Sequence, residues 1–152
     1  MEIKEYTGEK RLLMPLLLLA DEEEAMVLRY LERGTVFVLA ENGEICAECT
    51  ATDEGGGLLE IKNIAVYPRY QGRGYGRALL AFTENFYRDT FRTVQVGTSP
   101  ANIPFYEKCG FTRSHTIAGF FTQNYTHPIY ENGILLTDML YLKKNLNPTS
   151  QN

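Results

Sequence analysis

The sequence predicts a mixed α+β fold in one domain, and three features of the chain lead to this expectation. Apolar residues recur at helical spacing before residue 35, three short strand patterns lie between residues 35 and 66, and a helical pattern follows the third. A chain of 152 residues buries one sizeable core and not two. We therefore expect a single domain at residues 1–145 and a polar tail at residues 146–152.

Two helices are expected in the N-terminal third. Residues 12–20 are apolar and contain one proline, which favours a short helix that begins or kinks there. Residues 21–34 repeat apolar side chains on one helical face. Asp21 is the expected N-cap, with Glu24 three residues later, and Gly34 is expected to close the helix in a left-handed conformation.

Strand patterns dominate the middle of the chain. Residues 35–40, 44–52 and 58–66 predict a three-stranded meander, with an Asn-Gly tight turn after the first strand and a glycine-rich turn after the second. The remaining elements are expected in alternation: a helix at residues 77–88, a strand at 93–96, a helix at 103–108, and strands at 111–117 and 134–142. The chain from Lys143 onward is expected to be frayed.

The composition excludes several classes of protein. A hydrophobic fraction of 44% with 12% aromatic residues is typical of a globular domain, and residues 12–20 are too few for the ~20 that cross a bilayer. The N-terminus lacks the basic start and unbroken apolar centre of a secretory signal, so we expect a cytoplasmic protein without a membrane partner. A net charge of −4 argues against a nucleic-acid binder and favours a small cationic substrate.

Cys46 and Cys49 have the spacing of a metal or redox pair. The chain has only three cysteines and no histidine cluster to complete a metal site. Both residues fall inside a predicted strand, where residues three apart face opposite sides. We interpret them as strand residues and expect no bound metal. His115 and His127 have no companion nucleophile, and neither is assigned to catalysis.

The most informative segment runs from Ile64 to Arg77, where a strand, a short loop and a glycine-dense helix start follow one another. A helix N-terminus leaves about four backbone N–H groups unpaired and carries partial positive charge, so it can bind a phosphate. Glycines let the backbone approach that anion, and Arg69, Arg73 and Arg77 add positive charge. The segment matches neither a dinucleotide fingerprint nor a P-loop, and its glycines alone are equally typical of an ordinary turn.

Two longer patterns lie in and after this segment. Gln71-x-x-Gly74-x-Gly76 follows an Ile-Ala-Val strand and a Tyr-Pro turn, and residues 102–111 read Asn-Ile-Pro-Phe-Tyr-Glu-Lys-Cys-Gly-Phe. They resemble the pyrophosphate-binding motif and the second signature of the GNAT superfamily of acyl-coenzyme A (acyl-CoA) N-acetyltransferases. The resemblance covers residues 35–117 well and the region after Phe120 weakly. It implies a twisted, mostly antiparallel sheet of six to seven strands, splayed at the cofactor cleft and flanked by about four helices.

The resemblance also implies acetyl-CoA as acetyl donor, no metal, and direct transfer in a ternary complex. Backbone N–H groups from Gly72 to Arg77 would hold the pyrophosphate, and the strand backbone at residues 64–66 would pair with the pantetheine arm. The implied cofactor-binding residues are Ile64, Ala65, Val66, Gln71, Gly72, Arg73, Gly74, Tyr75, Gly76, Arg77 and Asn102. Ser99 holds the usual position of the family's pantetheine-binding asparagine, which leaves the role of Asn102 open.

Transfer to an amine needs a neutral nucleophile, a polarised carbonyl and a proton for the departing thiolate. By resemblance Tyr106 is the general acid, and a packed helix residue is the alternative. Glu60 is the first candidate for the base, because some relatives have a glutamate base at this position; ordered water, or an exposed strand carboxylate without a catalytic role, is the alternative. The N–H of Val66, at a bulge typical of the family, would polarise the carbonyl.

The acceptor site is expected to include part of residues 120–133, where aromatic residues lie beside an acidic group: Phe120, Phe121, Tyr125, His127, Tyr130 and Glu131. A core or homodimer contact explains the aromatic residues equally well. The predicted reaction is acetyl transfer to the primary amine of a small cationic molecule. The alternatives are a protein amino group as acceptor, a non-catalytic acyl-CoA sensor or assembly module, and a dimerisation domain without coenzyme affinity.

Overall fold

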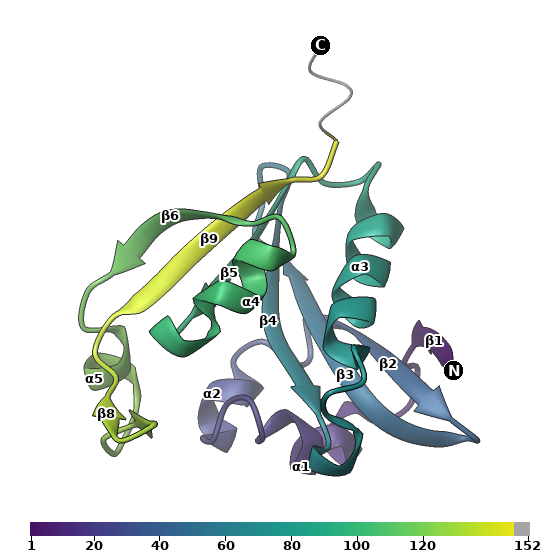
Figure 1. Cartoon of the computed structure of the whole chain (residues 1–152), viewed down its shortest axis with the longest axis horizontal. Helices are drawn as coiled ribbons and strands as arrows, with labels where there is room; N and C mark the ends of the chain where they lie inside the picture. Colours follow the sequence, from purple (N-terminus) through teal and green to yellow (C-terminus); the bar gives the residue numbers. More distant parts are fainter. Residues whose placement is uncertain (148–152) are drawn as a thin grey trace.

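The structure is a computed structural model that describes residues 1–147, and its centre is a seven-stranded sheet (Figure 1). The strand order is β1-β2-β3-β4-β5-β9-β6, and every neighbouring pair is antiparallel except β4 with β5. This confirms the predicted mixed α+β fold. The elements, with 3-10 helices labelled η, are β1 (Glu2–Glu5), η1 (Lys10–Leu13), α1 (Met14–Leu17), α2 (Glu24–Leu28), β2 (Thr35–Glu41), β3 (Glu44–Asp53), β4 (Leu58–Val66), η2 (Pro68–Tyr70), α3 (Tyr75–Tyr87), β5 (Thr93–Thr98), η3 (Pro100–Asn102), α4 (Ile103–Lys108), β6 (Thr112–Ile117), α5 (Phe120–Asn124), β7 (Tyr130–Glu131), β8 (Ile134–Leu135) and β9 (Met139–Asn145).

Most predicted elements are present. β2, β3 and β4 form the expected meander, and Asn42 (φ 52°) and Gly43 (φ 80°) make the tight turn between β2 and β3. α3 begins slightly before its predicted start, and α4 has its predicted bounds. The sequence patterns did not predict β1, α5 or the β7–β8 hairpin. All three are short, so they contain too few residues for a periodicity to show.

The C-terminal strand differs from the prediction. Instead of one strand at residues 134–142, the chain forms the short β8 and then β9. β9 continues along β5 to Asn145, and Leu146 is fully buried in the core, so the chain is not frayed from Lys143. The burial of this apolar side chain stabilises the extension. Residues 148–152 of the predicted tail lie outside the described residues.

Two predicted caps of the second helix are wrong. The N-cap of α2 is Glu23, and it makes no side-chain capping bond. The Asp21 carboxylate instead accepts a hydrogen bond from the Tyr125 hydroxyl at 2.8 Å, so a long-range contact engages it. Gly34 does not have a positive φ, and its N–H bonds the carbonyl of Tyr30 at 3.0 Å.

Gly34 is needed for space and not for a left-handed backbone. A Cβ at this position would lie 3.0 Å from the Tyr30 carbonyl oxygen and 3.0 Å from Cγ2 of Thr50. We expect Gly34→Ala to lower the free energy of unfolding by about 1–3 kcal/mol, because backbone and buried side chain must both shift. Urea unfolding at pH 7 measures this change. Gly76→Ala is the control, because its Cβ would meet neighbours only at 3.7–4.0 Å, and equal loss in both variants would contradict the steric argument.

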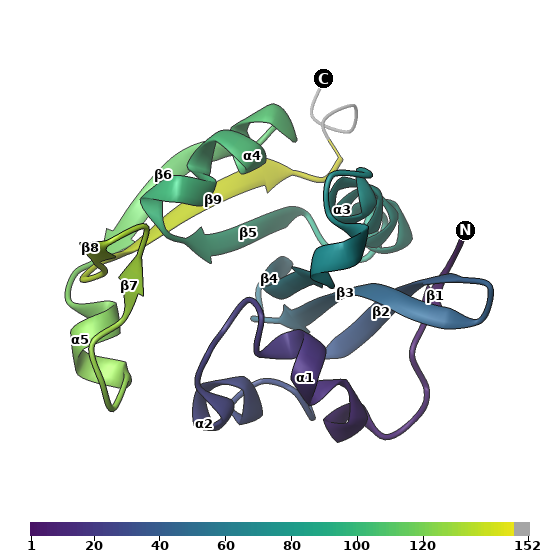
Figure 2. The ribbon, with the colours of Figure 1, turned by 60° about the horizontal axis from the view of Figure 1, so that its bottom comes forward.

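Helices cover both faces of the sheet (Figure 2). Leu79 of α3 packs in one apolar cluster with Phe37, and Val27 of α2 packs in another with Val38. Phe37 and Val38 are neighbours in β2, so the alternation of strand side chains sends them to opposite faces. Both faces of this part of the sheet are therefore covered by helices, whereas β6 at the far edge is exposed.

Two bulges alter the alternation of side chains in the sheet. The register of β2 with β3 skips Cys46, and the register of β3 with β4 skips Lys62. The first bulge explains why Cys46 and Cys49 belong to the same buried cluster, although an unbroken strand would place them on opposite faces. Within residues 1–147, no group of three or more His, Cys, Asp or Glu side chains could hold a metal ion.

Candidate active site

β4 and β5 separate part-way along their length and leave a cleft. Their parallel pairing ends at Ile61 with Val96. Beyond that point residues 62–66 of β4 have no partner on the β5 side, and the two strands line a cavity of about 270 Å³ that also includes Asn102 and Tyr106. This separation is the splay that the sequence resemblance implies. It leaves one backbone edge of β4 available to an extended ligand.

The glycine-rich turn presents free backbone N–H groups to an adjoining cavity of about 540 Å³. The first backbone bond of α3 runs from the Ala78 N–H to the Gly74 carbonyl at 3.0 Å. Among residues 1–147 no bonded acceptor is found for the N–H groups of residues 72–77. Gly72 and Gly74 both have φ of +80°, and no atom lies within 4 Å of a Cβ built on either. The start of α3 therefore offers open donors and partial positive charge to an anion.

The three arginines around the turn have different surroundings. Arg77 lines the 540 Å³ cavity. Arg69 pairs with the Glu44 carboxylate at 2.5 Å, and the Arg73 guanidinium lies over the Tyr70 ring at 5.3 Å from its centroid. The predicted cationic cluster therefore contributes Arg77 and not Arg69 to the cleft. The predicted cofactor-binding residues that do line the two cavities are Ile64, Ala65, Val66, Gln71, Gly72, Gly74, Tyr75, Gly76, Arg77 and Asn102.

Gln71 and Asn102 lie where the cavities adjoin. Gln71 lines both cavities, and its side-chain amide donates to the Val66 carbonyl at 3.0 Å, which ties the turn to the end of β4. Asn102 lines both of them and a third. The Ser99 hydroxyl donates to the Glu131 carboxylate at 2.5 Å. Of the two candidates for the pantetheine contact, Asn102 is therefore the one that faces the cleft.

Tyr106 lines both the 270 Å³ and the 540 Å³ cavities. Its side chain is 8% exposed and packs edge-on against Phe105 and Phe111, with ring centroids 5.0 and 5.7 Å away. Its hydroxyl makes no hydrogen bond within the described part of the chain. Burial raises the pKa of Tyr106, so the phenol keeps its proton at neutral pH and is able to donate it.

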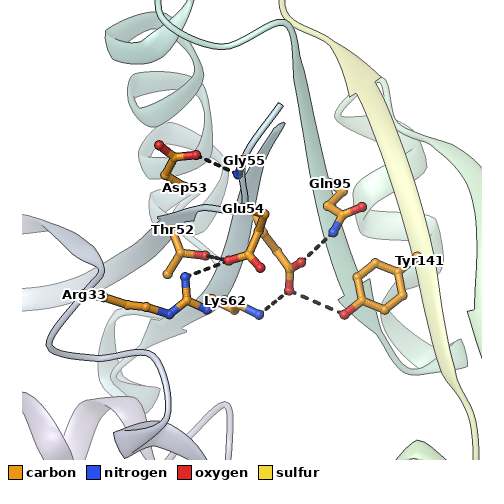
Figure 3. A network of polar contacts seen from close by, with 9 residues as sticks. Arg33, Thr52, Asp53, Glu54, Gly55, Lys62, Gln95 and Tyr141 are labelled. Carbon is orange, nitrogen blue, oxygen red and sulfur yellow. Dashed lines mark hydrogen bonds and ion pairs between the residues drawn. The ribbon is translucent and has the colours of Figure 1, made fainter. Parts of the chain in front are cut away.

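Glu60 is buried and held by three polar groups. The Gln95 amide donates to one carboxylate oxygen at 2.6 Å, and the Lys62 ammonium lies 2.7 Å from the other. The Tyr141 hydroxyl approaches that second oxygen at 3.4 Å. Figure 3 shows these three side chains converging on one carboxylate. Glu60 lines a separate cavity of about 250 Å³ that does not include Tyr106.

The bulge in β4 lies at Lys62 and not at the predicted Val66. Val66 pairs in register with Ala47, whereas the register shift falls between Ile61 and Asn63. This position coincides with the end of the β5 pairing, because a strand that leaves its neighbour is free to take up an extra residue. Lys62 is a site residue that the sequence patterns did not predict. The available signal was a lysine two residues after Glu60 in a mainly apolar strand.

A cavity of about 260 Å³ adjoins the cleft beside the connection between α1 and α2. It shares Lys62, Asn102 and Glu131 with the 270 Å³ cavity. The segment that was predicted for the acceptor supplies part of its lining: Phe121, Tyr125, Ile129, Tyr130 and Glu131. Two cavities therefore meet the cleft, one that follows the glycine-rich turn and one that opens between the N-terminal connection and the β7–β8 hairpin.

Comparison with known proteins identifies the family to which this chain belongs. A model of the acetyltransferase (GNAT) domain matches residues 32–113, which include β4, the glycine-rich turn and Tyr106. Over 149 residues, 95% of each chain, the sequence is 34% identical to the uncharacterized N-acetyltransferase YvbK of Bacillus subtilis (strain 168). The chain belongs to the GNAT acetyltransferase family. Membership of this family makes the chain an acyl-CoA-dependent acetyltransferase.

Solved GNAT structures share the fold over nearly the whole chain. A GNAT family acetyltransferase from Elizabethkingia anophelis with acetyl-CoA bound has a TM-score of 0.89 at 32% identity, over 95% of this chain and 97% of that one. An IAA acetyltransferase from Bacillus cereus has a TM-score of 0.87 at 30% identity, over 95% and 98%. A Bacillus subtilis acetyltransferase in complex with CoA has a TM-score of 0.85 at 32% identity, over 95% and 97%. In the described part of this GNAT chain, no helix is long and apolar enough to cross a membrane.

Proposed function

We propose that this GNAT acetyltransferase moves an acetyl group from acetyl-CoA to the primary amine of a small cationic molecule, in one step within a ternary complex. The observation that carries the proposal is the row of open N–H groups at residues 72–77, at one end of a cleft that also contains Tyr106. Relatives with bound acetyl-CoA and bound CoA support acetyl-CoA as the donor.

The cleft suits each part of the donor. The N–H groups of residues 72–77 and the nearby Arg77 would bind the pyrophosphate. The pantetheine arm would lie along the free edge of β4 at residues 64–66 and accept and donate backbone hydrogen bonds like an added strand. The Asn102 amide would contact the arm, since it lines every cavity that meets there.

The residues around the cleft support direct transfer. In the described chain no cysteine lines these cavities, and Cys46 and Cys49 are fully buried. Ser99 is bonded to a carboxylate, without a histidine to activate it. The amine would therefore attack the thioester itself, and Tyr106 would protonate the departing thiolate.

The reaction is tested by thiol release from acetyl-CoA across a panel of putrescine, tyramine, lysine and a short peptide with a free N-terminus. We expect turnover with at least one small amine and an acetylated product of the corresponding mass. Acetyl-CoA binding without turnover on any amine would instead support a non-catalytic sensor. Acetylation of the peptide alone would support a protein amino group as the acceptor.

Gly74→Ala is expected to weaken acetyl-CoA binding by about 10–100-fold, the equivalent of one lost hydrogen bond to a charged group. Gly74 has φ of +80°, where a side chain strains the backbone, and its Cβ would stand in the open space of the cleft. Gly43→Ala is the matched control, because Gly43 has the same φ of +80° and open space around it but lies in the turn between β2 and β3, away from the two cavities. Calorimetry with CoA measures both. A Gly74→Ala affinity equal to that of the natural chain would remove Gly74 from coenzyme binding.

A further inference from the structure

Among residues 1–147, one carboxylate that lines the cleft has no cationic partner. We propose that Glu131 binds the ammonium group of the acceptor and takes its proton before transfer, an inference that rests on the proposed function. Glu131 ends β7 and is half-buried. It lines both the 270 Å³ cavity, which includes Tyr106, and the 260 Å³ cavity beside the N-terminal connection. The carboxylate therefore lies between the cavity that contains Tyr106 and the cavity that the acceptor would enter.

One hydrogen bond orients this carboxylate. The Ser99 hydroxyl donates to Oε1 of Glu131 at 2.5 Å, and Ser99 is only 4% exposed, directly after β5. Within residues 1–147 the Glu131 side chain has no second hydrogen bond and no ion pair, so Oε2 is available to a ligand. A neutral hydroxyl fixes the group without cancelling its charge, and an ammonium ion would supply the missing positive charge.

The contrast with Glu60 explains why Glu131 is the stronger candidate for the base. Both oxygens of Glu60 are engaged, and its charge is already balanced by Lys62 at 2.7 Å. The other buried carboxylate with a cation, Glu84, is paired with Lys144 at the same distance. In both pairs a lysine ammonium already occupies the place that the ammonium group of an acceptor would take. Glu131 has no such partner among the described residues, and unlike Glu60 it shares a cavity with Tyr106.

The groups around Glu131 also favour a positively charged acceptor. The other titratable residues that line its two cavities are Asp21, Glu22, Lys62, Tyr106, Tyr125 and Tyr130. The Asp21 carboxylate accepts the Tyr125 hydroxyl and has no ion pair within residues 1–147, and burial raises the pKa of Asp21. Lys62 is committed to Glu60. Carboxylates therefore outnumber ammonium groups here, and an amine that is protonated in water is attracted as its cation.

The step balances in protons. The acceptor enters as R–NH3⁺, and Glu131 removes one proton to give R–NH2. The nitrogen attacks the thioester carbon, a C–N bond forms, the C–S bond breaks, and the Tyr106 hydroxyl gives its proton to the departing sulfur. The proton lost from the attacking nitrogen returns to Tyr106, and Glu131 releases its proton to water. The products are the acetamide, CoA thiol and one proton.

Glu131→Gln tests the proposal with acetyl-CoA and the amine of the panel that the natural chain acetylates fastest. The amide keeps the shape of the side chain and still accepts from Ser99, but it cannot take a proton. We expect kcat/KM at pH 7 to fall by about 100-fold, with the deficit shrinking to less than about tenfold near the pKa of the amine, where solvent supplies the neutral form. Calorimetry with CoA is expected to give an unchanged Kd.

Two further variants separate catalysis from structure. Ser99→Ala removes the orienting bond, and as a positioning residue it is expected to lose about tenfold with the same recovery at high pH. Glu60→Gln releases Lys62 and is expected to lower kcat/KM by the same factor at every pH, because no proton acceptor is lost. All three variants retain the residues of the glycine-rich turn.

Each possible result of these measurements either supports or overturns the proposal. A Glu131→Gln deficit that is the same at every pH, or smaller than about threefold at pH 7, overturns the proposal. Recovery at high pH in Glu60→Gln and not in Glu131→Gln makes Glu60 the base and also overturns it. If the natural chain binds acetyl-CoA but acetylates none of the amines, the proposed function fails and this inference fails with it. If the natural chain acetylates an amine and only Glu131→Gln departs from the expected result, the proposed function stands and the role of Glu131 as the base is rejected.

Discussion

Tyr106→Phe is expected to lower kcat by about 10²–10⁴-fold, the usual effect of removing a general acid. The thiolate would then leave without a positioned proton. The hydroxyl has no hydrogen bond in the described chain, and the ring packs against Phe105 and Phe111, so phenylalanine keeps the packing and removes only the donor. Because burial raises the pKa of Tyr106, the natural phenol stays protonated at any working pH near neutrality. The KM for acetyl-CoA is expected to change by less than about threefold.

Steady-state thiol release measures this effect, with Tyr70→Phe as the matched control. Tyr70 lines the same 540 Å³ cavity, but its hydroxyl donates to the Glu44 carboxylate at 2.8 Å and is engaged away from the reaction. We expect Tyr70→Phe to keep most of the activity. Unchanged turnover in Tyr106→Phe would exclude Tyr106 as the acid, and an equal loss in both variants would indicate a packing effect.

Glu48→Gln is expected to stabilise the chain at alkaline pH. Glu48 is fully buried in β3, and one of its oxygens accepts the Thr50 hydroxyl at 2.6 Å, whereas the other accepts no hydrogen bond from residues 1–147. Burial raises the pKa of Glu48 from its ordinary 4.5 to about 8. The folded chain therefore binds a proton that the unfolded chain releases, and its contribution to stability is complete below pH 4.5 and is lost as pH rises through about 8.

The size of this effect is on the order of 4–5 kcal/mol as an upper bound, from the separation of the two pKa values. Urea unfolding of both chains between pH 5 and 9 measures it. We expect the natural chain to lose stability across this range and Glu48→Gln to lose less, so that the two curves diverge with pH. Parallel curves would show that Glu48 does not titrate there.

Glu84→Gln is the control for Glu48→Gln. Glu84 is also buried, but its carboxylate lies 2.7 Å from the Lys144 ammonium. Removing one partner of such a pair leaves a charge without compensation, so this variant is expected to be less stable than the natural chain at each of these pH values. The opposite signs of the two glutamate substitutions at pH 9 would come from the presence or absence of a counterion.

Local chemistry explains which parts of the fold were predictable. The Asn42-Gly43 turn and the alternating residues of β2 and β3 carry their conformation in neighbouring residues, and each is present as predicted. The caps at Asp21 and Gly34 failed for the opposite reason. Asp21 is engaged by Tyr125 from far along the chain, and Gly34 is constrained by the approach of Thr50. Neither contact leaves a trace in adjacent residues.

The candidate site likewise has parts that local sequence patterns predicted and parts that they did not. The sequence alone determined the strand and the glycine-rich turn, because a helix start and the glycines before it are a property of consecutive residues, and the family resemblance of residues 102–111 pointed to Tyr106. Only the tertiary structure decided that Glu60 is paired with Lys62, that the bulge lies at Lys62, and that Ser99 holds Glu131. Those facts depend on where β4 leaves β5 and where the β7–β8 hairpin folds back. Strand register and long-range packing determine both positions. They depend on contacts between residues far apart in the sequence, which no local sequence pattern contains.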